Sequence, residues 1–446
     1  SDDTVKTHCG LLLLRQLFKQ LEARPTSRRD ALEVLSANTL PTLLTLAPAF
    51  TQVALQQGLH SLEAFKMLKL VLKCLYSAVH MAVSRQIQQD IDPWMQVILR
   101  AVELPLSVAE MPPTQRSALE KAPPASCRKW AFRILLRFAN RHGNPRRALN
   151  GTEDFAKAWS ASYLVPVTEV FLREACILAK SSWVPNRSVS TAFLGLAAAC
   201  ACDSAYTAAI RPGLQLLLQD GIFPIIRFQQ HDLKLWQEDP EEFVRQMHND
   251  FDSFREPRTA AGELVERLIR HREDEILTPL LQFCRGHLDA HSNNPNDFEL
   301  CANKDGALFV LGMLSDDLLR LDPAQEGRTK KSKKRTENLK SGVSVEELLV
   351  NYVDRDLSSS VAFLRCRALW IYEKVAATVK LSSAGSVGAA CRRCVQLMAD
   401  PELPVRVQAS TSLRSFMQRT SNDDVSAVLT QDVAGLLQRL LRTLAE

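Results

Sequence analysis

The segment Asp400–Phe416, DPELPVRVQASTSLRSF, carries the pattern that decides the fold. Its first two residues are typical of a turn, and Pro404 suits the first turn of a helix, where a proline's missing N–H needs no partner. Apolar residues then recur at steps of three or four as far as Phe416, which places them on one helical face. The segment therefore predicts a turn and then an amphipathic helix, with Arg406 three positions before Ala409.

The same basic-x-x-Ala spacing occurs in three earlier segments. The four alanines are separated by steps of 46, 61 and 41 residues, and without the 20 residues of Pro323–Gly342 the step of 61 becomes 41. Such a period is typical of HEAT-type repeats, in which each unit is a pair of antiparallel helices. The four pairs are Arg258/Ala261, Lys304/Ala307, Arg365/Ala368 and Arg406/Ala409.

The composition agrees with a helical repeat protein. The chain has 446 residues, of which 46% are hydrophobic, 24% are charged and only 16 are glycine. A single globular core of this length is unusual, whereas a repeat array has no such limit because each unit packs only on its neighbours. We therefore predict an all-α fold, a HEAT/armadillo-like helical-repeat solenoid that winds into a superhelix.

The predicted domain organisation is one repeat array with an insert. Residues 1–322 form a HEAT-repeat array with a proline-rich loop near 105–126, and residues 343–446 continue the array. The segment 323–342 is predicted to be a basic, disordered insert because it is polar and has few apolar anchors.

The repeated alanine and basic residue suggest how the repeats join. A small alanine lets a neighbouring helix approach closely, and the basic side chain can reach carbonyl or carboxylate oxygens of the adjacent repeat. Inter-repeat ladder contacts are therefore expected from Arg258, Lys304, Arg365 and Arg406.

No constellation for catalysis, a cofactor or a metal is found in the sequence. Cys391 and Cys394 have CxxC spacing, but they lie on a predicted helix without a second pair, so core thiols are the favoured interpretation. Phosphate-binding glycine loops and nucleophile elbows are absent from the sequence. The eleven scattered cysteines favour a reducing compartment. We therefore predict a protein that is not an enzyme.

Neither a membrane span nor a nucleic-acid surface is expected. No apolar run reaches the length of about 18 residues that a membrane helix needs, and the net charge of +5 is small for a chain of this length. The chain begins with Ser1 and almost at once enters a helical pattern, so we expect a piece of a longer protein.

One strong basic run stands out in the insert. It is interpreted as a solvated, flexible segment, or as a contact for an acidic partner, or as a signal similar to a nuclear localisation signal. Nucleic acid is a disfavoured partner because no aromatic residues interleave the lysines. The residues are Lys330, Lys331, Lys333, Lys334 and Arg335.

The stretch WQEDPEEFVR, Trp236–Arg245, carries a family resemblance. Asp239-Pro240 can cap and open a helix, and two acids follow in its first turn. This stretch resembles the helix start of the importin-β (karyopherin-β) nuclear transport receptors, especially importins of the seven/eight type. The likeness continues in order over nearly the whole chain. The signature residues are Trp236, Glu238, Asp239, Pro240, Phe243 and Arg245, with a role that is expected to be structural.

The resemblance implies a nuclear import receptor that shuttles between nucleus and cytoplasm through the nuclear pore. Such a receptor binds protein cargo, is regulated by the GTPase Ran and contacts Phe-Gly nucleoporins. The resemblance covers the central part of these receptors, so their N-terminal Ran-binding repeats lie outside it. Two alternatives stay open, an exportin of the importin-α exporter type and a HEAT-repeat scaffold outside transport. The Trp236 stretch is shared with the importin-α exporter.

Overall fold

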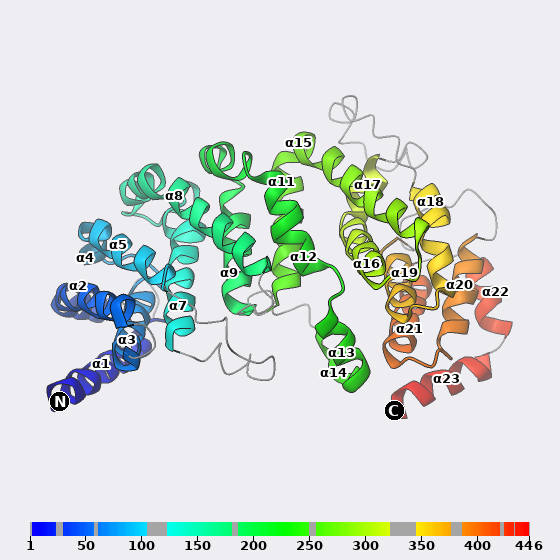
Figure 1. Cartoon of the computed structure of the whole chain (residues 1–446), viewed down its shortest axis with the longest axis horizontal. Helices are drawn as coiled ribbons and strands as arrows, with labels where there is room; N and C mark the ends of the chain where they lie inside the picture. The colour runs from blue at the N-terminus through cyan, green and yellow to red at the C-terminus, as the bar shows by residue number, and fades with distance from the viewer. Residues whose placement is uncertain are drawn as a thin grey trace. The chain divides into compact units, whose positions relative to one another are not determined.

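The computed structural model (Figure 1) describes residues 2–23, 30–57, 61–104, 123–180, 186–248, 256–321, 345–375, 386–419, 423–431 and 433–445. Every regular element in these ranges is a helix. The chain forms two compact units, and each is treated by itself below. The first contains residues 1–225 and 252–267, and the second contains residues 226–251 and 268–446.

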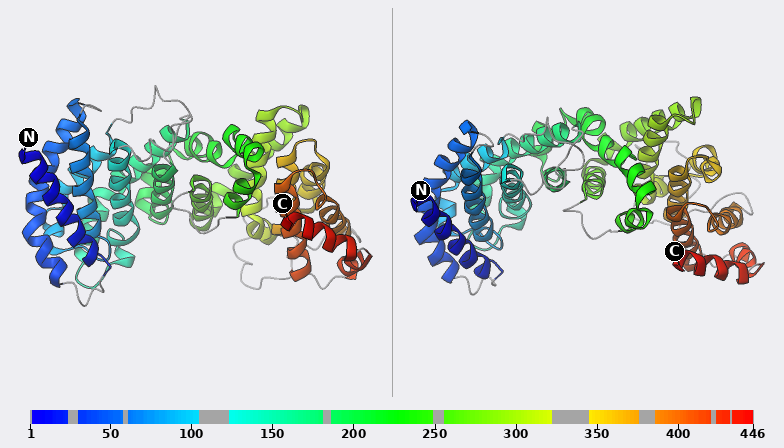
Figure 2. Two further views of the ribbon diagram at one scale, coloured as in Figure 1. Left: turned by 90° about the horizontal axis from the view of Figure 1, so that it is seen from below. Right: turned by 60° about the horizontal axis from the view of Figure 1, so that its bottom comes forward.

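The first unit consists of consecutive helix pairs in two layers. Helices α1, α3, α7 and α9 pack side by side in one layer, and α2, α5 and α8 contribute to the other. The order can be followed in Figure 1 from dark-blue α1 to green α9, and in Figure 2 α1 lies against the blue helices that follow it. The elements are α1 (Asp2–Leu21), α2 (Asp30–Gln57), α3 (Leu62–Ala78), α4 (Arg85–Gln89), α5 (Ile91–Val102), α7 (Pro123–Arg137), η4 (Phe138–His142), η5 (Pro145–Arg147), α8 (Glu153–Lys180), α9 (Asn186–Ala199), α10 (Asp203–Ala205), η6 (Tyr206–Ile210), α11 (Leu214–Leu216), η7 (Leu217–Ile222) and α12 (Phe223–Ile226).

The core of the first unit lies between these layers. Phe65, Trp94, Phe132 and Phe171 are all fully or almost fully removed from solvent. Phe132 of α7 and Phe171 of α8 stack with their ring centres 6.0 Å apart. Because each helix contributes its apolar face to both its own pair and the next, burial is continuous along the layer.

The second unit repeats the same plan. Helix α19 packs against α16 and α21, and α20 packs against α21 and α22. Helix α15 (Pro257–Asn293) runs from the first unit into the second and is interrupted at Arg272, whose φ of −140° and ψ of 35° are not helical. The remaining elements are α13 (Gln230–Glu238), α14 (Pro240–Met247), α16 (Phe298–Met313), α17 (Ser315–Leu321), α18 (Val345–Leu348), η9 (Leu349–Val353), η10 (Asp354–Ser358), α19 (Ala362–Val375), α20 (Ser386–Leu397), α21 (Leu403–Arg419), α22 (Asp423–Gln431) and α23 (Val433–Ala445).

One predicted boundary is wrong by a turn of helix. The proline-rich loop was expected to reach Ser126, but α7 begins at Pro123. Prolines are tolerated in a first helical turn because the N–H groups there have no intrahelical acceptor, so Pro123 and Pro124 begin this helix rather than prevent it. The rest of the predicted loop, residues 105–122, lies outside the described residues, as does the predicted basic insert 323–342.

Candidate protein-binding elements

Two short helices, α13 and α14, form a distinct element of the second unit, here called the Trp236 hairpin (residues 230–247). Asp239 separates the helices, and its carboxylate accepts a hydrogen bond of 3.0 Å from the backbone N–H of Glu242. Pro240 occupies the first helical position. The sequence Asp-Pro-Glu-Glu thus ends one helix and starts the next, with acids where the helix dipole favours negative charge.

The apolar side of the Trp236 hairpin is an aromatic cluster. Trp236 and Phe243 are buried, and their ring centres lie 4.9 Å apart. Phe228 contacts both rings and stacks on Phe363 of α19, with 4.0 Å between the centres. The hairpin is therefore anchored to a neighbouring repeat by aromatic burial, the largest contribution that a few side chains can make.

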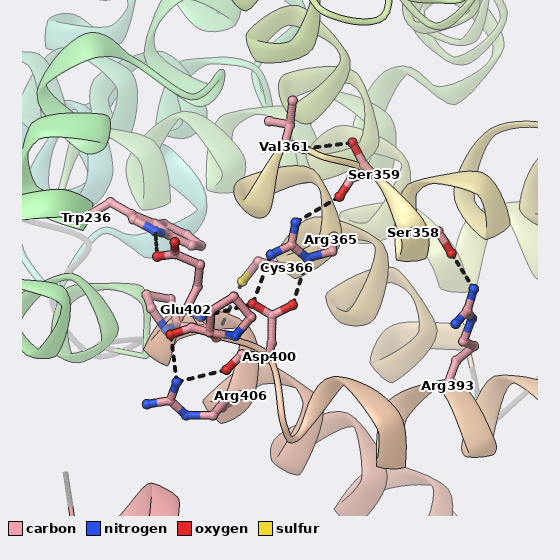
Figure 3. A network of polar contacts seen from close by, with 12 residues as sticks. Trp236, Ser358, Ser359, Val361, Arg365, Cys366, Arg393, Asp400, Glu402 and Arg406 are labelled. Carbon is pink, nitrogen blue, oxygen red and sulfur yellow. Dashed lines mark hydrogen bonds and ion pairs between the residues drawn. The ribbon is translucent and has the colours of Figure 1, made fainter.

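A polar contact fixes the same hairpin to α21. The indole Nε1 of Trp236 donates a hydrogen bond of 2.8 Å to Oε2 of Glu402 (Figure 3). A sulfur contact of 3.9 Å joins Cys366 of α19 to Met247 at the end of α14. The rings of Trp236 and Phe243 thus pack inside the second unit and are largely removed from solvent.

Glu238 and Arg245, the other signature residues, lie on the outer side of the hairpin. Nζ of Lys234 is 3.8 Å from the carboxylate of Glu238, and both side chains are about two-thirds exposed. Arg245 donates from Nε to Glu242 at 2.6 Å. Hydrogen bonds from Gln246 and Arg245 lower the pKa of the Glu242 carboxyl. These exposed charges are the part of the signature that is accessible to another molecule.

Lys304 and Arg365, two of the basic residues of the repeat pattern, each pair with an acid that precedes a later helix. Nζ of Lys304 in α16 is 2.7 Å from Oδ1 of Asp356, which precedes α19. Arg365 of α19 donates from Nε and Nη2 to the carboxylate of Asp400, at 2.8 and 2.9 Å, and Asp400 precedes α21 (Figure 3). Each contact therefore joins one repeat to the next.

Arg406 and Arg258, the other two basic residues of the pattern, are arranged differently. Nη1 of Arg406 donates to the carbonyls of Asp400 and Pro401, both at 2.9 Å, and so closes the turn of its own repeat. Arg258 lies in the first turn of α15, where its side chain is half-buried. The acids that complete the ladder, Asp356 and Asp400, have no regular spacing from Lys304 and Arg365 and were not recognised in the sequence.

Burial changes the chemistry of one ladder acid. Asp356 is almost fully buried, and this raises the pKa of its carboxyl to about 6, although the ammonium of Lys304 acts in the opposite direction. A carboxylate without water is stabilised only by its partners, so the Lys304–Asp356 pair depends on its geometry.

The two cysteines of the CxxC pair lie in the interior of the second unit. Cys391 and Cys394 are both buried in α20, and burial raises the pKa of both thiols, that of Cys391 to about 11. Within the described ranges no group of three or more histidine, cysteine or acidic side chains is placed to hold a metal ion. Such thiols are poor nucleophiles and poor metal ligands because both roles need the thiolate.

The predicted acidic-partner contact, Lys330 to Arg335, lies outside the described residues. Taken singly, none of the described helices is long and apolar enough to cross a membrane. Residues Ser188–Ala199 and Asp203–Ile210 reach that length and composition only together, with a bend of 115° between them.

The sequence of this chain is similar to those of known proteins. No family model matches the chain. The chain is 27% identical over 429 residues to the importin beta-like SAD2 homolog of Arabidopsis thaliana, and 26% identical over 445 residues to importin-8 of Homo sapiens. These matches cover 95% and 98% of the chain, and the chain spans 39% of each relative's length.

Among solved structures, the exportin Cse1 in its cargo-free, cytoplasmic state matches with a TM-score of 0.71. The match has 14% sequence identity and covers 100% of this chain and 46% of that one. This likeness confirms the predicted all-α, HEAT-repeat class. The chain is thus an all-α helical-repeat protein. Its sequence is similar to importins of the importin-β family over almost its whole length.

Proposed function

We propose that this chain is the cargo-binding part of a karyopherin that carries proteins through the nuclear pore under the control of Ran. The supporting observation is the similarity to importins over 95% and 98% of the chain. The chain spans less than half of those relatives, so the remaining receptor functions belong to the longer proteins. Import is the proposed direction, and the protein shuttles between cytoplasm and nucleus.

The mechanism is binding through a distributed surface. Each repeat contacts only its neighbours, so a small change in several joints alters the surface offered to cargo. Ran in its GTP form then releases import cargo by binding preferentially to a conformation that fits cargo less well. Phe-Gly nucleoporins are the partners that admit the receptor to the pore.

Export is the second candidate, because the fold matches the exportin Cse1 and the Trp236 signature is shared with the exporter of importin-α. The two directions differ in the sign of the coupling between Ran and cargo. Ran-GTP weakens the binding of import cargo, whereas it strengthens the binding of export cargo. A scaffold outside transport has no coupling to Ran and no affinity for Phe-Gly segments.

The test is a binding experiment with the parent protein and this chain in parallel. Immobilised Phe-Gly repeat segments and a cytosolic extract are each presented without Ran, with Ran-GDP and with Ran-GTP. The proposal predicts Phe-Gly binding, and extract proteins that are retained without Ran and released by Ran-GTP. Retention only with Ran-GTP indicates the exportin. Parent protein that is indifferent to Ran and to Phe-Gly segments overturns the transport proposal.

A further inference from the structure

The open side of α3 is made of lysines. From Ala64 to Ala78 every residue of this helix is buried except Lys66, Lys69 and Lys73. These positions are three and four residues apart, so they lie on one helical face. Glu63 lies at the beginning of this face and is paired with Lys66, whose Nζ is 2.6 Å from its carboxylate. Lys69 and Lys73 extend the face without an acid.

The neighbouring helix α7 presents the same kind of face. Between Pro124 and Leu136 only Lys129, Trp130 and Arg133 are not buried, and Arg137 follows one turn later, half-buried. Helix α7 and the η4 turn after it contain no acidic residue. Because α3 and α7 pack side by side, the two faces form one continuous surface.

Aromatic rings hold the arginines of this surface in place. The guanidinium of Arg133 lies 4.6 Å from the centre of the Trp130 ring and 4.8 Å from that of Tyr76. Arg137 donates a hydrogen bond of 3.3 Å to the Tyr76 hydroxyl. Within the described residues neither arginine forms an ion pair with a carboxylate. Their charges are therefore fixed in position and available to an outside anion.

Helix α1, which packs against α3, adds Arg15 and Lys19. Glu22 beyond its end accepts a hydrogen bond of 2.6 Å from Ser77 and lies 3.9 Å from Arg15. The excess of positive charge affects the pKa of one of its own lysines. Burial, and after it the charges of Lys69, Arg15 and Lys19, lower the pKa of Lys73.

A similar cluster in the second unit contains an arginine whose charge is balanced by a carboxylate. Arg367 lies 4.9 Å from the Trp370 ring centre and 5.0 Å from that of Phe309, the same arrangement as at Trp130. There, however, Asp305 of α16 binds the guanidinium at 2.8 and 3.3 Å. Among the residues that the structure describes, no acid is paired with Arg133, so this cluster has the aromatic support without the counter-charge.

We propose that this surface binds an extended, acidic polypeptide segment of a partner protein. The name "basic face" is used below for its residues, Arg15, Lys19, Lys69, Lys73, Trp130, Arg133 and Arg137. Guanidinium groups fixed by aromatic rings are suited to carboxylates, which they bind through two parallel hydrogen bonds. Packed helices lie 8–10 Å apart, so a path from α1 across α3 to α7 is about 20 Å long and needs about six extended residues.

The same observations disfavour nucleic acid. Binding of single strands relies on bases that stack on open aromatic rings. At the basic face the Trp130 ring is already occupied, by Arg133 and by Nζ of Lys73 at 5.4 Å, and Tyr76 is buried. The proposal does not rest on the transport function, because a scaffold could use the same surface.

The test uses the whole 446-residue chain and a fluorescein-labelled peptide of about 12 residues that alternates glutamate and serine, a length that spans the face with residues to spare. Fluorescence anisotropy at low salt measures binding. A peptide with glutamine in place of glutamate is the ligand control. We expect tighter binding of the glutamate peptide and a loss of at least about tenfold in affinity for Arg133→Glu/Arg137→Glu, since two attractive contacts become repulsive.

Two further variants separate the basic face from general charge. Arg146→Glu/Arg147→Glu changes the net charge equally at two exposed positions of η5 and should alter affinity by less than about twofold. Arg133→Gln/Arg137→Gln keeps hydrogen-bonding groups near Tyr76 and should still weaken binding. Circular dichroism verifies that each variant is folded.

Three results overturn the proposal. The first is equal affinity for the glutamate and glutamine peptides. The second is equal weakening by the two charge reversals, which would reduce the effect to net charge. The third is tighter binding of a single-stranded RNA of the same length, lost on reversal of Arg133 and Arg137, which would make the surface a nucleic-acid site. None of these readouts involves Ran or Phe-Gly segments, so the outcome is independent of the transport tests.

Discussion

Trp236 and Glu402 are 166 residues apart in sequence and are joined by a hydrogen bond of 2.8 Å. The indole N–H is the only polar group of a side chain that otherwise packs against Phe228 and Phe243. The bond therefore orients the aromatic cluster while the ring surface provides most of the stability. It also links the family signature to the segment that defines the repeat.

The two contributions of Trp236 can be separated by substitution. We expect Trp236→Ala and Phe243→Ala each to lower the free energy of unfolding by about 3–5 kcal/mol, as loss of a large buried ring does. Trp236→Phe removes the hydrogen bond but retains much of the ring, and should cost about 1–2 kcal/mol. Urea denaturation followed by circular dichroism measures both. A loss near zero for either alanine variant would mean that the ring is exposed.

The Arg365–Asp400 joint should be sensitive to the shape of the cation. Arg365→Gln leaves the buried Asp400 carboxylate without its partner and is expected to cost about 3–5 kcal/mol. Arg365→Lys retains the charge but not the two parallel hydrogen bonds. Its loss of unfolding free energy should therefore be smaller than that of Arg365→Gln but still measurable. Arg285→Gln is a matched control, because its pair with Asp289 is 3.7 Å long and exposed. That variant should lose less than about 1 kcal/mol, and equal costs at the two sites would contradict the ladder.

Two helical glycines should respond to alanine in opposite directions. A Cβ at Gly312 of α16 would lie 2.2 Å from the Trp370 ring of α19, so Gly312→Ala must separate two packed helices and should cost about 1–3 kcal/mol. Gly286 of α15 is exposed, and a Cβ there meets nothing within 4 Å. Gly286→Ala should stabilise by about 0.5–1 kcal/mol. Thermal unfolding of the two variants decides, and a stabilising Gly312→Ala would refute the close contact.

His291 should make the second unit less stable in acid. Burial, and secondly the ammonium of Lys304, lower the pKa of this imidazole to about 4. An unfolded histidine has a pKa of about 6.5, so the unfolded chain binds more protons below that value. The stability is complete above pH 6.5 and is lost as the pH falls towards 4. By pH 5 this contribution should be smaller by about 2 kcal/mol than at pH 7.5.

The measurement for His291 is a difference between two proteins. Asp356, whose raised pKa acts in the opposite sense over this range, titrates in both the unmodified chain and His291→Gln. Unfolding free energies from pH 5 to 7.5 should therefore fall more steeply with acid in the unmodified chain. Parallel curves would show that His291 takes up protons as readily folded as unfolded.

The buried thiols should be unreactive in the folded chain. Cys9 is exposed and Cys202 is partly exposed, whereas burial raises the pKa of Cys127 and Cys366 to about 12. Iodoacetamide at neutral pH should alkylate Cys9 first, because the reactive form is the thiolate. Peptide mapping by mass spectrometry locates the label. Rapid modification of Cys391 or Cys394 without denaturant would reopen a redox or metal role.

The sequence predicted the class of the fold because repetition adds many weak signals. The spacing of Lys304, Arg365 and Arg406 indicated HEAT-type repeats, and Asp239-Pro240 indicated a helix start that the structure has at Pro240. The start of α7 was wrong because proline allows both a loop and a first helical turn. The division into a repeat array and a basic insert, and the roles of the selected site residues, stay predictions.

What the sequence could not supply was pairing across repeats. Asp356, Asp400 and Glu402 are ordinary surface-type residues when read along the chain, and only packing reveals which cation or indole each one meets. The basic face was not predicted from the sequence for the same reason. The proximity of Arg133 and Arg137 to the lysines of α3 is a property of the folded layer.

The joints at Lys304–Asp356 and Arg365–Asp400 have a consequence for cooperativity. Each joint stabilises only the contact with the next repeat. The second unit is therefore expected to unfold repeat by repeat rather than in one all-or-none transition of a single core. The length over which repeats unfold together depends on the weakest joint. A chain with one joint broken should therefore unfold in two separate steps, with the boundary at the substituted repeat.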